Sequence, residues 1–121
     1  MSSFPCPCCG YLTMAEPPES YEICGVCFWE DDSSQLRWPF SVEGANYVSL
    51  VEGQRNFVEL GACEARLVPH VRPVAPTDVR DPGWRPIEPA VDSFEGEDEW
   101  APWPEDRTVL YWWRDTFWRK G

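Results

Sequence analysis

The sequence is poor in positive charge and has no long apolar run. Only ten of its 121 residues are Lys or Arg, against 21 Asp and Glu, so the net charge is −11 at pH 7. Binding to a phosphate backbone depends on Lys and Arg, and the composition therefore argues against a nucleic-acid partner. No stretch of about 18 apolar residues exists, so we expect neither a membrane-spanning helix nor a membrane partner.

Signals for export and for common catalytic sites are also missing. The start, MSSFPCPCCG, has neither the basic nor the apolar segment of a secretory leader, and we expect a cytoplasmic protein. The single histidine, His70, lies in the proline-rich stretch LVPHVRP, where a structural role is more common than catalysis. No nucleophile and base stand at a recognisable spacing, and no phosphate-binding glycine loop is present. An enzyme is therefore the less favoured class.

Cysteine is the residue type that carries chemistry here. Thiols stay reduced in the cytoplasm, where clustered cysteines indicate metal binding rather than disulfides. The chain has two C-x2-C pairs with 14 residues between them, slightly fewer than in most four-cysteine zinc sites but enough for a short hairpin. We predict one structural zinc bound by Cys6, Cys9, Cys24 and Cys27. Iron in a rubredoxin-type site uses the same ligand pattern, and the sequence leaves it open.

The remaining cysteines are placed outside this set. Cys8 would have to share an ion with its direct neighbour, so we interpret it as a small turn residue, with a reactive thiol as the alternative. Cys63 is predicted to be a small buried hydrophobe. In the first pair, Pro7 fixes φ at the start of the turn, and Gly10 permits a left-handed step after it.

One helix is predicted clearly, over Leu50 to Leu60. Ser49 and Glu52 form a capping box before it, and Gly61 is the expected stop. Gly53 inside the helix costs about 1 kcal/mol relative to Ala. The apolar face that we expect to be buried consists of Leu50, Val51, Phe57, Val58 and Leu60.

The rest of the chain gives weaker patterns. Tyr11–Leu12 and Tyr21–Ile23 are expected to be short strands, whereas residues 31–46 are expected to form a loop. Frequent prolines predict a mostly irregular course from residue 63 to residue 104. Residues 108–113 have both strand propensity and helical spacing, so the sequence does not decide between the two.

These elements predict a small α+β fold. Its core is a zinc-ribbon-like double knuckle with one clear helix, and an irregular Pro- and Trp-rich acidic tail follows. We expect residues 1–76 to form the metal-knuckle domain and residues 77–121 to be an extension that packs on the same domain.

Two acidic stretches are candidate sites. Glu30, Asp31 and Asp32 directly follow the second cysteine pair; we favour a solvated turn beside a core Trp29, and the alternative is a site of paired carboxylates or for a divalent ion. Residues 86–106 hold eight acids and no Lys or Arg. Tryptophan is rare in flexible linkers and enriched at interface hot spots, so we predict a partner-binding surface there. Its residues are Glu97, Asp98, Glu99, Trp100 and Trp103.

Several motifs resemble those of the cysteine-rich CPCC family of small bacterial proteins. They are CPCCGY, YEICGVCFWEDD, GAN, RNF on the helix and GACE, spread from Cys6 to Pro73. The resemblance implies a bacterial origin and a metal-knuckle core. It implies no reaction, and the chain from Thr77 onward carries no part of it.

The favoured function is a non-catalytic, zinc-stabilised acidic binding protein that docks on a basic protein partner. One form of it is an immunity-type protein that blocks a bacterial toxin, with the acidic strip imitating a phosphate chain. The alternative is a small metal-containing hydrolase or other enzyme that uses the Glu30, Asp31 and Asp32 patch.

Overall fold

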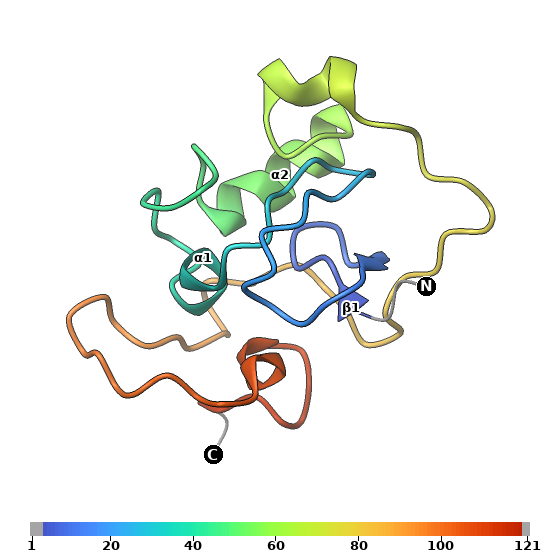
Figure 1. Cartoon of the computed structure of the whole chain (residues 1–121). Coiled ribbons are helices and arrows are strands. Elements are labelled where there is room, and N and C mark those ends of the chain that lie inside the picture. Colours follow the sequence, from blue (N-terminus) through green and yellow to red (C-terminus); the bar gives the residue numbers. More distant parts are fainter. Residues whose placement is uncertain (1–3, 120–121) are drawn as a thin grey trace.

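The computed structural model describes residues 4–119 and places the first cysteine pair inside a small hairpin. Strand β1 (Phe4–Pro5) and strand β2 (Leu12–Met14) pair antiparallel, with Phe4 opposite Met14 and Pro5 opposite Leu12. The CPCCG turn lies between them. The pair of short strands thus closes the first knuckle, and Figure 1 shows the two strands side by side near the N-terminal end of the chain.

The expected strand Tyr21–Ile23 is wrong. Only Ile23 makes a β-bridge, and its partner is Glu30 on the far side of the second cysteine pair. A hydrogen bond of 3.0 Å from the Tyr21 amide to the Asp31 carbonyl extends this closure. Each C-x2-C turn brings its own flanking segments side by side, so each knuckle closes locally instead of pairing with the other.

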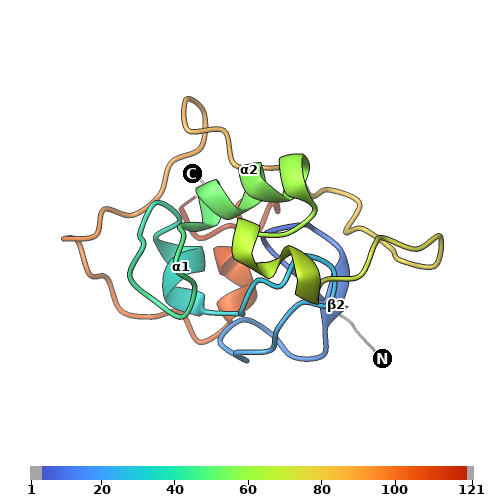
Figure 2. The ribbon, with the colours of Figure 1, turned by 90° about the horizontal axis from the view of Figure 1, so that it is seen from above.

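Helix α2 (Leu50–Leu60) is confirmed with its predicted bounds. The Ser49 side chain accepts a hydrogen bond of 3.2 Å from the Glu52 amide, as a capping residue should. Gly61 ends the helix in the left-handed conformation, with φ of 81°. Figure 2 shows α2 lying across one side of the knuckles.

The predicted buried face of α2 is partly wrong. Leu50 and Val51 are buried and Phe57 is half-buried, but Val58 is 81% exposed and Leu60 is 45% exposed. The helix is turned so that positions without large apolar side chains, Gly53 and Gln54, also face inward.

Gly53 explains this orientation. A Cβ atom at residue 53 would lie 3.2 Å from the Trp29 ring and 3.3 Å from the Cys8 sulfur. The missing side chain lets α2 approach the knuckles closely, and this packing offsets the low helix propensity of glycine.

Helix α1 (Ser33–Arg37) lies within the segment that was expected to be a loop. The Asp32 carboxylate caps it by accepting a hydrogen bond of 2.8 Å from the Ser34 amide. The buried Gln35 amide then ties α1 to the next loop, because its nitrogen donates to the carbonyl groups of Ser41, Asn46 and Val48. Long-range contacts of this kind leave no local sequence pattern.

The remainder of the chain is mostly irregular, as predicted. Two short 3-10 helices interrupt it, η1 (Ala65–His70) and η2 (Arg107–Leu110). Of the undecided residues 108–113, those up to Leu110 are therefore helical, and residues 111–113 are neither helix nor strand. The carboxyl-terminal segment passes along α1 on the side opposite α2 (Figure 1, orange to red). Leu110, Tyr111 and Trp112 are almost fully buried there. Between residues 4 and 119, no helix has the length and apolar character needed to cross a bilayer.

Candidate metal centre

The structure brings the four predicted ligands together at the centre of the fold. The Sγ atoms of Cys6, Cys9, Cys24 and Cys27 all lie within 4.8 Å of one another, and all four residues have 0% exposure. The Cys6–Cys27 and Cys9–Cys24 sulfur pairs are 3.6 Å and 3.7 Å apart. A tetrahedral zinc ion with Zn–S bonds of about 2.3 Å places sulfurs roughly 3.8 Å apart. The four cysteines therefore fit a four-coordinate metal ion.

The two knuckles share one backbone geometry. The Gly10 amide donates to the Cys6 carbonyl over 2.7 Å, and the Phe28 amide donates to the Cys24 carbonyl over 2.8 Å. The residue after each pair has positive φ, 82° at Gly10 and 70° at Phe28. The predicted left-handed step at Gly10 is confirmed. Phe28 adopts the same conformation without a glycine's freedom, which costs of order 1–3 kcal/mol.

The extension covers the first knuckle. A Cβ atom at Gly10 would lie 2.5 Å from the Trp84 ring, so only glycine fits below it. The Trp84 indole donates to the Pro7 carbonyl over 3.1 Å, and the Arg80 Nε donates to the Cys9 carbonyl over 2.9 Å. Sequence reasoning missed both residues, because nothing local marks a contact with a partner more than 70 positions away.

Hydrogen bonds favour a thiolate within the cluster. Bonds from the neighbouring thiols, that of Cys27 above all, lower the pKa of Cys24, and the Thr13 hydroxyl adds another over 3.2 Å. Burial raises the pKa of Cys6 and Cys27. A bound cation would deprotonate such buried thiols, because metal ligation requires thiolates.

Cys8 and Cys63 lie outside the four-sulfur cluster and are buried. Their exposures are 1% and 0%, which confirms the prediction that Cys63 is a buried small hydrophobe. The Cys63 amide donates to the Cys27 carbonyl over 2.8 Å, so this residue also anchors the chain beside the second knuckle. Burial raises the pKa of both thiols, which argues against the reactive-thiol alternative for Cys8.

Two of the three acids after the second knuckle are buried and Glu30 is half-buried, so the idea of a solvated turn is wrong for Asp31 and Asp32. Asp31 and Asp32 are 3% and 5% exposed. Asp31 accepts a hydrogen bond of 2.6 Å from the Ser20 hydroxyl. Asp32 caps α1 and also accepts a hydrogen bond of 2.9 Å from the Ala45 amide. Both carboxylates therefore hold loops in place, and Trp29 beside them is a core residue.

His70 is positioned by packing. Its ring lies 5.5 Å from that of Phe28, the residue with the left-handed backbone. This contact supports the structural role that the sequence favours for His70.

Asp31 predicts a pH dependence of stability. Burial raises its pKa to about 6, from an ordinary value of 3.8. The folded protein then binds this proton more tightly than the unfolded chain, so the free energy of unfolding should fall as the pH rises from 3.8 to about 6. The loss amounts to about 2–3 kcal/mol.

The variant Asp31→Asn should lack this loss. Chemical denaturation of both proteins across this pH range measures it, because the acid sensitivity of the cysteine cluster is common to both and cancels in the difference. The variant's stability relative to the parent protein should rise with pH. A constant difference would show that Asp31 titrates normally.

The predicted partner surface divides into two parts. Glu97, Asp98, Glu99 and Trp100 are exposed, Trp100 by 65%. Trp103 is half-buried, because the guanidinium groups of Arg37 and Arg107 lie 4.4 Å and 4.7 Å from its ring. Trp103 thus packs partly within the chain, and its place in a partner surface stays a prediction.

The acidic strip is not free of bases in three dimensions. Glu95 pairs with Arg37 and Asp92 with Arg85, each over 2.6 Å. Glu99 lies 3.4 Å from Arg119. Arginines distant in the sequence thus neutralise part of the strip. Glu97 and Asp98 keep their charge open to solvent, since neither forms an ion pair with any residue in the range 4–119.

The comparisons with known proteins bear on the amino-terminal part of the chain. No curated protein matches the sequence. Residues 4–78, more than half of the chain, match the model of the family described as Cysteine-rich CPCC. The match contains both knuckles, α1 and α2, and it agrees with the resemblance seen in the motifs. The chain belongs to the cysteine-rich CPCC family.

Proposed function

We propose that this chain is a non-catalytic, zinc-stabilised protein that docks on a basic protein partner through its acidic face. The acidic face is defined as Glu97, Asp98, Glu99 and Trp100, which are all exposed. Trp103 serves as support below it.

The cysteine cluster is proposed to be a structural zinc centre of the zinc-ribbon type. Four cysteine ligands complete the coordination of zinc and leave no open position, as in structural rather than catalytic sites. When bound, the ion would cross-link the two knuckles. The surrounding residues of the chain exclude water, since all four cysteines are fully buried.

The observation that supports this proposal most is that hydrogen bonds fix the acidic face to α1. Below it, Glu95 is 4% exposed and accepts hydrogen bonds from Arg37 and from the Ala101 amide, over 2.6 Å and 2.8 Å. The chain on either side of the face is thereby fixed to α1. Fixed acids beside an exposed tryptophan match what protein interfaces use, because charge steers association and buried aromatics supply affinity.

An immunity-type inhibitor of a bacterial toxin is the form of this function that we favour. A small, acidic, cytoplasmic protein suits a basic toxin with a cationic cleft. Arginines pair with three of the eight acids of the strip, Asp92, Glu95 and Glu99. Within the acidic face, Glu97 and Asp98 form no ion pair with any residue of the range 4–119, and they are the proposed phosphate-like part.

Capture of the partner from the native host, followed by association kinetics, tests the proposal. The triple change of Glu97, Asp98 and Glu99 to Ala should slow association about tenfold or more at low salt, and the effect should shrink as salt is added. The matched control changes Glu16, Glu52 and Glu59 to Ala, which removes the same charge from exposed positions outside the acidic strip. Equal rates for the triple variant and the parent protein would refute docking through the acidic face.

One observation favours the alternative of a small hydrolase. The raised pKa of Asp31, about 6, suits a general acid or base. The burial of Asp31 and its bond to Ser20 speak against substrate access. Hydrolysis of a substrate by purified protein, with loss of activity in Asp31→Ala, would replace the binding proposal by this one.

A further inference from the structure

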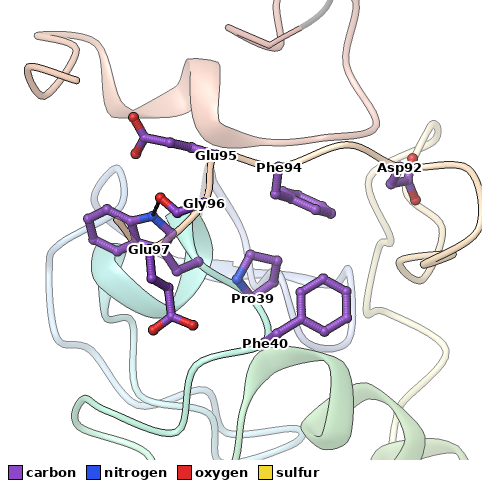
Figure 3. Close-up of a pocket in the computed structure, with 8 residues that line it drawn as sticks. Pro39, Phe40, Asp92, Phe94, Glu95, Gly96 and Glu97 are labelled. Atoms are coloured by element: carbon purple, nitrogen blue, oxygen red, sulfur yellow. Dashed lines mark hydrogen bonds between the residues drawn. The ribbon is translucent and has the colours of Figure 1, made fainter. Parts of the chain in front are cut away.

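A hollow with aromatic walls lies beside the acidic face. It has a volume of about 240 Å³ and opens between the end of α1 and residues 92–97. In Figure 3, Glu97 lies at one end of it and Asp92 at the other, whereas Glu95 points away. We call it the aromatic groove, and its walls are Trp38, Pro39, Phe40 and Phe94.

The walls are held by contacts within the chain. The Trp38 indole donates to the Gly96 carbonyl over 3.2 Å. The rings of Phe40 and Phe94 meet edge to face, with centroids 6.3 Å apart. The groove is thus formed by side chains that are already positioned, although Phe40 remains 52% exposed.

A second hollow of about 200 Å³ continues the groove on the other side of Glu97. It is lined by Glu43 and Trp100 and shares Trp38 with the first. Each hollow is smaller than the roughly 300–1,000 Å³ of small-molecule sites. Each therefore has the size for a single side chain rather than for a free metabolite.

The charge around both hollows is negative. Asp92 is already paired with Arg85. Glu43 and Glu97 form no ion pair with any residue of the described range 4–119. Aromatic walls with unpaired carboxylates at the rim complement a cationic side chain, because the rings attract the cation and the carboxylates accept charged hydrogen bonds from it.

We propose that the aromatic groove and the second hollow each bind an arginine side chain of the partner, one on each side of Glu97. This inference rests on the proposed function and specifies its basic partner as an arginine-bearing one. A planar guanidinium stacks on rings and pairs with a carboxylate at the same time, which the ammonium of lysine does less well.

The chain uses this combination in its own interior. The Arg37 guanidinium lies 4.6 Å from the Trp38 ring, 4.4 Å from the Trp103 ring and 4.8 Å from the Trp118 ring. It also pairs with Glu95. Trp38 thus contacts an arginine inside the chain and also lines both hollows.

Peptide titration of the metal-loaded full chain tests the proposal. The probe is acetyl-Gly-Arg-Gly-Arg-Gly-amide, and the matched peptides carry lysine or uncharged citrulline in place of arginine. The arginine peptide should bind about threefold or more tightly than the lysine peptide, and the citrulline peptide weakest. The NMR signal of the Trp38 indole N–H should shift on binding. Equal binding of the arginine and lysine peptides, or shifts confined to other parts of the chain, would overturn the proposal.

Two variants locate the site without disturbing the core. Glu97→Gln should weaken the arginine peptide about threefold, whereas Glu59→Gln, an equal charge change on α2, should not. An unchanged affinity in Glu97→Gln would also overturn the proposal. This test and the docking test fail separately. If the triple change of the acidic face leaves the association rate of the partner unchanged, the proposed function is refuted. If that rate falls but the arginine and lysine peptides bind equally, only the arginine site is refuted.

Discussion

Replacing Cys6 by serine should abolish metal binding and unfold the knuckles. A structural zinc contributes apparent free energies of about 10–16 kcal/mol in finger peptides, which equals or exceeds the roughly 5–15 kcal/mol that holds a whole domain together. The described chain has two very short strands and one long helix, and the four cysteines lie in its buried core. Metal content and circular dichroism of the purified variant measure the effect, and a strong chelator should reproduce it in the parent protein.

Cys8→Ser is the matched control. Cys8 is buried in the same turn, and its sulfur lies beside Gly53 of α2 and interacts with the Cys27 thiol, but it is not one of the four sulfurs that could share an ion. A buried hydroxyl costs about 1–3 kcal/mol, so the variant should be less stable yet retain its metal. Loss of metal in Cys8→Ser with retention in Cys6→Ser would show that the ligand set is wrong.

Arg37→Ala should cost about 3–5 kcal/mol, because it leaves Glu95 buried without its partner. The Arg37 and Glu95 side chains are 0% and 1% exposed, and their hydrogen bond lowers the pKa of Glu95. The variant also removes the group on which Trp103 and Trp118 stack. We expect residues 92–103 to detach from α1, with faster proteolysis of this segment and a lower midpoint of chemical denaturation.

Arg85→Ala provides the comparison. Arg85 pairs with the Asp92 carboxylate through two hydrogen bonds, whereas Arg37 makes one to Glu95, and the Arg85 side chain is 43% exposed. The Asp92 side chain is only 8% exposed but keeps a hydrogen bond of 2.8 Å from the Glu88 amide, so this variant should cost less than Arg37→Ala, about 1 kcal/mol. An equal loss of unfolding free energy in Arg37→Ala and Arg85→Ala would mean that burial of the Arg37–Glu95 pair does not increase its contribution to stability.

The cysteine spacing and the helix caps were sufficient to predict the centre of the molecule. C-x2-C pairs impose a local turn, and Ser49 and Gly61 bracket α2 by hydrogen bonds within a few residues. Such local rules hold whatever the rest of the chain does. The rotation of α2 was not predictable in this way, because it depends on the space that Gly53 leaves for Trp29.

The carboxyl-terminal half contains contacts between distant residues, which local sequence patterns do not predict. The stretch around Trp103 reads as a uniformly acidic strip, but Arg37 and Arg85 supply charges from elsewhere in the fold. Helix α1 likewise depends on the loop contacts of Gln35, whose partners lie up to 13 positions away and leave no local pattern in the sequence. Partners separated by up to 58 positions decide these features.

Native mass spectrometry of the chain purified from its host without added metal tests the metal centre most directly. We expect a folded protein with one zinc ion and four protons displaced from Cys6, Cys9, Cys24 and Cys27. Unfolding in acid should release the ion and restore the mass of the protein with six free thiols. A compact, fully folded chain that carries neither zinc nor iron would contradict the proposed metal centre.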